Sequence, residues 1–338
     1  MTDRTSRQIH LKSRPAGMPR PENFELAEVS VPEPGPNQVL VRNIWMSVDP
    51  YMRGRMMDRE SYVPPFQIGA PLDGGAVGVV EVSNHPDLKP GDHVTHMMGW
   101  RERFVTDGGG LARVDGSAAP LQAYLGVLGM PGLTAYSGLL RIGEPKEGET
   151  VFVSAASGAV GAVVCQIAKI KGCRAVGSVG SDEKARWLTD VAGIDAAVNY
   201  KKVPDLEVAI ANACPKGIDV YFENVGGAHL VAALNLMNSF GRIPLCGMIS
   251  QYNLEKPEPG PWNLVLAVAK SLKLQGFIVT NYLDMLDDFQ RDMTKWIGEG
   301  RIKWHETVSE GIETAPQAFL NLFTGGNFGK MLVKLSEG

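Results

Sequence analysis

The stretch VFVSAASGAVGAVVCQIAK, residues 151–169, carries the pattern that decides the fold. An apolar run enters a cluster of small residues, and a segment with apolar residues at helical spacing leaves it. Aligned to G-x-G-x-x-G, the cluster reads A-x-G-x-x-G. A strand, a glycine turn and a helix in succession indicate a dinucleotide site, because the turn lets backbone approach a pyrophosphate and the helix N-terminus offers free N–H groups. We expect contacts from Ala156, Gly158, Ala159, Val160 and Gly161.

Strands and helices alternate on both sides of this stretch. The residue pattern predicts strands at 150–155, 174–179, 195–199, 218–225, 241–248 and 274–279. Helices are predicted at 158–171, 182–191, 206–214, 228–237 and 262–272. This order is typical of an α/β fold with a doubly wound, six-stranded parallel sheet.

The first 125 residues differ in texture. They are rich in Pro and Gly and hold short β-type runs such as QVLVRNIWMSV and AVGVVEVS, separated by turn signals such as PEPGPNQ. Short strands without long helices between them predict a compact, mostly antiparallel barrel or sandwich. The tail from about 306 returns to strand–helix–strand, and we expect it to rejoin this first domain.

Composition excludes several classes of protein. The chain has 338 residues, 33 Lys+Arg against 37 Asp+Glu and a formal charge of -4, which favours neither nucleic acid nor an anionic membrane as partner. No apolar run is long enough to span a bilayer, and the N-terminus has no secretory pattern. The four cysteines are scattered, so we expect a cytoplasmic protein with unpaired thiols.

The second strand of the sheet predicts which dinucleotide binds. An NAD site usually ends this strand in an acid that holds the ribose 2′-OH, but here it ends Val179–Gly180–Ser181, without charge. Lys184 follows and could pair with a 2′-phosphate, although a solvated lysine would look the same. Asp182 is the natural acid of a first helical turn. We therefore favour NADPH over NADH.

Zinc has no obvious ligands in the first domain. That domain contains no cysteine, and His93 and His96 lie three apart on a predicted strand, where their side chains would face opposite sides. We expect no metal, so the group that polarises a substrate should be a hydroxyl or a backbone N–H.

Several longer motifs resemble one known family. SVDPYMRGRM, GMPGLTAY, AASGAVG, GSDEK, NVGG, CGMISQYN and GGNFGK are similar to motifs of the zinc-independent medium-chain dehydrogenase/reductases, in the branch of prostaglandin, alkenal and curcumin reductases. The resemblance implies a GroES-like catalytic domain over residues 1–126, completed by 306–338. It implies a Rossmann NADP-binding domain over residues 127–305 and a homodimer.

The resemblance also implies function. The expected reaction is NADPH-dependent reduction of the carbon–carbon double bond of α,β-unsaturated ketones and aldehydes. Quinone reduction, or a non-enzymatic NADPH-binding role, are the alternatives. Hydride would pass to the β-carbon, and either Tyr252 or the cofactor ribose hydroxyl would stabilise the enolate.

Individual residues follow from the same motifs. Tyr51, Tyr62 and Tyr252 would meet the substrate, with Tyr51 and Tyr252 as the catalytic pair. The cofactor would be held, besides the glycine turn, by Met130, Thr134, Gly180, Ser181, Lys184, Tyr200, Asn224, Cys246, Ile249, Ser250, Tyr252, Phe277, Ile278, Val279 and Asn327. Glu223 departs from the aspartate of the mammalian pattern, and residues 56–69 differ in length and content. Arg53 and Arg55 read either as a solvated pair or as an attraction for an acidic substrate tail.

Overall fold

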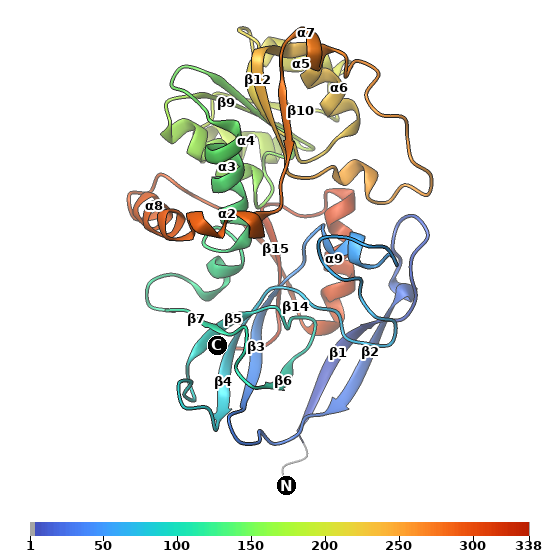
Figure 1. Ribbon diagram of the computed structural model, residues 1–338, viewed down its shortest axis with the longest axis vertical. Helices are drawn as coiled ribbons and strands as arrows, with labels where there is room; N and C mark the ends of the chain where they lie inside the picture. Colours follow the sequence, from blue (N-terminus) through green and yellow to red (C-terminus); the bar gives the residue numbers. More distant parts are fainter. Residues whose placement is uncertain (1–3, 338) are drawn as a thin grey trace. The chain divides into compact units, whose positions relative to one another are not determined.

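The computed structural model describes residues 4–337. The chain divides into two compact units (Figure 1). The first consists of Met1–Leu125, Glu306–Asn327 and Met331–Gly338, and the second of Gly126–His305 with Phe328–Lys330.

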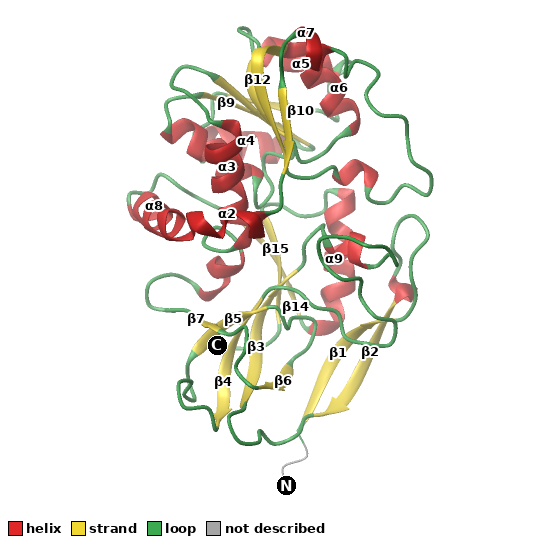
Figure 2. Ribbon diagram, viewed as in Figure 1, coloured by secondary structure: helices red, strands yellow, loops and turns green. Residues whose placement is uncertain are grey.

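The first unit is rich in β-strands (Figure 2). A hairpin pairs β1 (Thr5–Leu11) with β2 (Phe24–Ser30) in antiparallel register. A seven-stranded sheet runs in the order β14-β15-β3-β4-β5-β7, and β6 also pairs with β3. Its strands are β3 (Val39–Ser47), β4 (Ala76–Ser83), β5 (His93–His96), β6 (Arg103–Thr106), β7 (Ala112–Arg113), β14 (Glu306–Glu310) and β15 (Lys330–Lys334). The unit also holds the short helix α1 (Met52–Arg55) and helix α9 (Ala315–Thr324).

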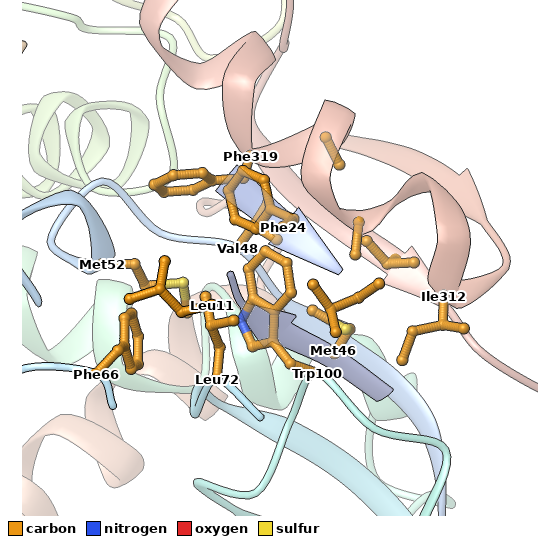
Figure 3. Packing of buried hydrophobic residues seen from close by; sticks show 14 of the residues in the cluster. Leu11, Phe24, Met46, Val48, Met52, Phe66, Leu72, Trp100, Ile312 and Phe319 are labelled. Atoms are coloured by element: carbon orange, nitrogen blue, oxygen red, sulfur yellow. The ribbon is translucent and has the colours of Figure 1, made fainter. Parts of the chain in front are cut away.

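The core of this unit joins chain segments that are far apart in the sequence (Figure 3). Trp100 is fully buried, stacks on Phe24 at 6.2 Å between ring centroids and meets Phe319 of α9 edge-on at the same distance. Met52 and Phe66 lie in the same cluster. The C-terminal segment therefore supplies part of the core of the first unit, as the strand–helix–strand tail predicted.

The second unit contains a six-stranded parallel sheet in the order β10-β9-β8-β11-β12-β13. The strands are β8 (Thr150–Val153), β9 (Arg174–Val179), β10 (Ala196–Asn199), β11 (Ile218–Phe222), β12 (Met237–Leu245) and β13 (Lys273–Gly276). The helices are α2 (Met130–Ser137), α3 (Gly161–Ile170), α4 (Asp182–Asp190), α5 (Leu206–Ala213), α6 (Gly227–Leu236), α7 (Leu266–Ala269) and α8 (Leu286–Gly298). In order of sequence the strands lie 3-2-1-4-5-6, so the predicted doubly wound sheet is confirmed.

Two predicted helices differ from the structure. Helix α3 begins at Gly161, not at Gly158, because Gly158 forms a bridge with Gly329 and the Ser157 carbonyl accepts a hydrogen bond from the Gly329 N–H at 3.0 Å. Helix α7 covers only Leu266–Ala269 of the predicted 262–272. No helix within residues 4–337 is long and apolar enough to cross a membrane.

Candidate functional site

The glycine turn lies at the carboxyl end of β8. A Cβ on Gly161 would lie 2.4 Å from the Ala155 carbonyl oxygen, so only glycine fits where α3 begins. Ala156 is fully buried, and its methyl lies 2.5 Å from the position that a Cβ on Gly177 of β9 would take. Alanine therefore replaces the first glycine of the motif because the neighbouring strand has no side chain at that point. The turn retains the close backbone approach that a pyrophosphate needs.

The segment Phe328–Lys330 packs against this turn. The Phe328 ring stacks on His305 at 4.1 Å, and Trp187 of α4 meets Phe328 edge-on at 5.5 Å. A Cβ on Gly329 would lie 1.8 Å from the His305 carbonyl oxygen, which makes glycine necessary there too. The three rings thus fix the backbone that bonds to Ser157.

A basic group surrounds the end of β9. Ser181 caps α4, accepting from the Lys184 N–H at 3.3 Å. A Cβ on Gly180 would lie 3.1 Å from the Tyr200 hydroxyl and 3.3 Å from Lys201 Cε. Burial, and then the nearby charge of Lys201, lower the pKa of Lys184. The Tyr200 phenol and the Lys201 side chain therefore lie against a bare glycine, within electrostatic range of Lys184, an arrangement that suits a phosphate.

Lys201 was missed by the sequence reasoning. It lies beside Tyr200 in the sequence, but only the packing of Tyr200 and Lys201 against Gly180 shows that both side chains reach the same place. Tyr200 is itself supported by the buried His229 ring, edge-on at 5.1 Å. Burial lowers the pKa of His229 to about 4, so this support is uncharged at neutral pH.

The first acid after β9 is already bound by other side chains. Asp182 accepts a hydrogen bond from Asn199 Nδ2 at 2.6 Å and forms an ion pair with Lys202. These bonds, from Lys202 first and then Asn199, lower the pKa of Asp182. The carboxylate that could have held a ribose 2′-OH is thereby turned to other partners.

A hydrogen-bond network holds the turn after β11. Asn224 donates its backbone N–H to Ser154 Oγ at 2.9 Å and its side-chain Nδ2 to the Ser154 carbonyl at 2.8 Å. Ser250 donates from its hydroxyl to the Val225 carbonyl at 2.6 Å. Asn224 and Ser250, both predicted cofactor residues, therefore belong to one network.

Glu223 lies beneath this turn and is fully buried. Its Oε1 accepts hydrogen bonds from Ser154 Oγ at 3.0 Å and from the N–H groups of Val225 and Gly226 at 2.6 and 2.9 Å. Burial raises the pKa of Glu223, against the opposing effect of the Gly226 and Val225 hydrogen bonds. Sequence reasoning noted this residue only as a departure from a pattern.

The segment after β12 places the Tyr252 hydroxyl close to Gly247. A Cβ on Gly247 would lie 2.9 Å from the Tyr252 hydroxyl, so the glycine makes room for the phenol. Ile249 donates its N–H to the Asn224 carbonyl at 3.2 Å. Burial raises the pKa of Cys246 to about 12, so its thiol stays protonated at neutral pH.

Strand β13 ends at Gly276, short of the predicted 279, and the apolar segment 277–279 follows it. The Phe277 ring meets Phe222 edge-on at 6.2 Å and is buried, and Ile278 and Val279 follow it. On α2, Thr134 donates its hydroxyl to the Met130 carbonyl at 2.7 Å. The predicted cofactor residues of the second unit thus follow the carboxyl ends of its parallel strands or lie on α2.

Three predicted residues belong to the first unit: Tyr51, Tyr62 and Asn327. The Tyr51 side chain packs against the core cluster of Figure 3, and its hydroxyl is buried without a hydrogen-bond partner within the described part of the chain. Burial and the charge of Asp49 raise the pKa of Tyr51, so its phenol keeps its proton. Tyr62 is 61% exposed.

His93 and His96 do not meet at a metal site. His96 is buried, its Nδ1 accepts from the Met98 N–H at 3.0 Å, and burial lowers its pKa to about 3. Across residues 4–337, no cluster of three or more His, Cys, Asp or Glu side chains could hold a metal ion.

Comparison with known proteins places the chain in a family. Residues 7–114 match the family described as the N-terminal domain of oxidoreductase, and residues 159–299 match the family described as zinc-binding dehydrogenase. The chain belongs to the medium-chain dehydrogenase/reductases, which confirms the resemblance seen in its motifs and the expected fold class.

Particular relatives match nearly end to end. The NADPH-dependent curcumin reductase of Escherichia coli (strain K12) is 47% identical over 336 residues, which cover 98% of this chain and 97% of that protein. The 2-alkenal reductase (NADP(+)-dependent) of Nicotiana tabacum is 44% identical over 339 residues, 98% of each chain. The crystal structure of CurA in complex with NADPH from Vibrio vulnificus has a TM-score of 0.94 at 44% identity, covering 98% of this chain and 100% of that one.

Proposed function

We propose that this protein catalyses the NADPH-dependent reduction of the carbon–carbon double bond of α,β-unsaturated ketones and aldehydes. Relatives named as curcumin and 2-alkenal reductases are similar over 98% of the chain, which supports this reaction class. The observation that carries the cofactor choice is the cluster of Lys184, Tyr200 and Lys201 around Gly180, beside an aspartate already bound by Lys202. The first unit is proposed as the catalytic domain and the second as the NADP-binding domain.

The proposed reaction adds a hydride to one carbon of the double bond and needs a hydrogen-bond donor at the carbonyl oxygen. When bound, NADPH supplies a hydride to the substrate β-carbon. The electron pair of the double bond then moves toward the carbonyl oxygen as an enolate, and the α-carbon takes a proton to complete the saturated product. A tyrosine hydroxyl keeps its proton at neutral pH, and the buried Tyr51 hydroxyl has no hydrogen-bond partner among residues 4–337, so we propose that it donates to the substrate. Tyr252 or the cofactor ribose hydroxyl is the donor proposed to stabilise the enolate oxygen.

Assembly and location form part of the same proposal. We infer a homodimer through the edge of the six-stranded sheet, where β13 is the last strand. The four free cysteines suit a reducing compartment, the cytoplasm.

The test of the reaction is NADPH oxidation with 3-penten-2-one, beside a quinone and a secondary alcohol, with NADH as the cofactor control. We expect the enone to be turned over with NADPH and 2-pentanone to be the product. Turnover of the quinone alone would replace this proposal with quinone reduction. Tight NADPH binding without any turnover would favour a non-enzymatic role.

The phosphate cluster is tested by two lysine substitutions. Lys201→Ala should weaken NADPH binding by about tenfold while leaving NADH binding unchanged, since an ion pair to a phosphate contributes on the order of 1–3 kcal/mol. Lys295→Ala is the matched control, because Lys295 is an exposed lysine of α8 that lies near Glu299. Equal losses for both variants, measured by titrating NADPH fluorescence, would contradict the assignment of Lys201.

A further inference from the structure

Residues 57–65 form a loop whose two ends are tied together. The Phe66 N–H donates to the Arg55 carbonyl at 2.7 Å, which closes the neck of the loop. The Arg14 side chain donates from Nη1 to the Met56 carbonyl at 3.0 Å and from Nη2 to the Phe66 carbonyl at 3.2 Å. One guanidinium from a distant segment therefore bridges both ends.

Arg55 holds the same loop from inside. It is only 9% exposed, so the reading of Arg55 as a solvated residue is wrong. Its Nε donates to the Pro64 carbonyl at 2.9 Å, and its guanidinium carbon lies 4.0 Å from the centre of the Phe66 ring. Its Nη2 lies 3.5 Å from Asp73 Oδ2, and Arg101 binds the other oxygen of Asp73 at 2.8 Å.

This combination uses properties that only arginine has. A planar guanidinium can stack on a ring and donate in its own plane at the same time, whereas a lysine ammonium is a point charge. Asp73, which is bound by Arg101, also anchors the guanidinium of Arg55. The loop is therefore held to the body of the first unit by a chain of charged contacts.

The loop carries Tyr62, and the short helix that ends at Arg55 begins just after Tyr51. Arg55, Tyr62 and Asp73 all act electrostatically on the Tyr51 hydroxyl. The clamp and the two tyrosines proposed to meet the substrate therefore lie in one neighbourhood of the first unit.

We infer that Arg14 and Arg55 are positioning residues that hold the Tyr62 loop beside Tyr51 and so determine which enones the protein accepts. This rests on the proposed function, in which both tyrosines meet the substrate. A bulky enone needs the wall formed by the loop, while the smallest enone reacts without it. Loosening the clamp should therefore change selectivity more than chemistry.

Limited trypsin digestion tests the clamp independently of activity. Arg59 is exposed within the loop, and cleavage there releases a fragment ending at residue 59. Arg14→Met and Arg55→Met should each speed this cleavage by about tenfold, because hydrogen bonds from a charged group are lost and proteolysis follows the population of the open loop. Arg113→Met, which removes an exposed arginine paired with Asp92, is the control. Adding Arg59→Gln should abolish the new fragment.

Kinetics test the consequence for selectivity. Benzylideneacetone serves as the bulky enone and methyl vinyl ketone as the small one. In Arg14→Met the KM for benzylideneacetone should rise about fivefold or more relative to the KM for methyl vinyl ketone, with kcat for the small enone within about twofold. Unchanged cleavage and an unchanged KM ratio in Arg14→Met would overturn the inference, and so would equal losses of kcat for both enones. If the unmodified protein reduces no enone, the proposed function fails, and faster cleavage at Arg59 would still establish the clamp.

Discussion

At the scale of single residues, Glu223 shows how burial sets a charge state. Its carboxyl group is fully buried, yet it organises the turn that holds Asn224 by accepting hydrogen bonds from two backbone N–H groups. Burial raises its pKa, so the fold favours the protonated form. The stability this form provides is complete below the pKa of an unfolded glutamate, about 4.3, and is lost as the pH rises through the folded pKa.

Glu223→Gln should therefore gain stability relative to the unmodified protein as the pH rises. The amide oxygen can accept the same three hydrogen bonds, and the amide never ionises. We expect its melting temperature to rise relative to the unmodified protein by about 2–4 °C between pH 5 and pH 8.

Glu149 provides the opposite control. Although burial opposes it, the hydrogen bonds from Arg242 lower the pKa of Glu149, so its charged form stabilises the fold. Relative to the unmodified protein, Glu149→Gln should lose stability as the pH rises from 3 to 7. Differential scanning fluorimetry across the pH range gives the melting temperatures of both variants and of the unmodified protein. If the melting temperature of a variant follows that of the unmodified protein at every pH, the charge state assigned to that glutamate is wrong.

At the scale of elements, the start of α3 depends on one carbonyl group. Ala155 has a left-handed backbone, with φ of 49°, and its oxygen faces both Gly158 and Gly161. A Cβ would lie 3.2 Å from that oxygen at Gly158 but 2.4 Å from it at Gly161. The Ala155 carbonyl oxygen therefore leaves room for a side chain at position 158 but not at position 161.

Gly161→Ala should be destabilised by about 1–3 kcal/mol, the usual cost of overpacking, because backbone atoms must move. Gly158→Ala should lose clearly less stability, since a few tenths of an ångström suffice. Urea unfolding of the two variants measures the difference. Equal losses would show that the turn is more adaptable than its geometry indicates.

At the scale of the whole molecule, one apolar patch is unusually exposed. Four of its residues lie close together in the chain, Trp262, Leu264, Val265 and Val268, of which Val268 is 82% exposed, and Phe240 is exposed as well. Phe240 of β12 has a left-handed φ of 63°. Its N–H donates to the Lys270 carbonyl at 2.7 Å, and this bond ties β12 to the residue that follows α7. Bulky residues rarely adopt this conformation. A second copy of the chain is the proposed cover for this patch.

Val268→Lys should convert a dimer into a monomer, because a charge would be buried without a partner in the interface. Val208→Lys is the matched control, since Val208 of α5 is also an exposed valine of the second unit, at 55%. Light scattering after size exclusion reads the mass directly. A monomeric unmodified protein, or a dimer in both variants, would contradict this patch as the interface.

Much of the fold could be predicted from the sequence because it depends on local patterns. Apolar runs and glycine turns are short-range features, and they predicted the order of strands and helices in the second unit. The start of α3 was wrong because Gly158 pairs with Gly329, which lies far along the chain. The site residues that followed from motifs stay predictions until the variants are measured.

By itself, then, the sequence determined the alternating elements, the glycine turn and the uncharged end of the second strand, since each is written in neighbouring residues. Only the tertiary structure decided which partners those residues meet. It placed Lys201 at Gly180, engaged Asp182 with Lys202, fitted Ala156 over Gly177 and buried Arg55 against Phe66. The physical reason is that charge pairing and close packing act through space, between segments whose separation along the chain carries no signal.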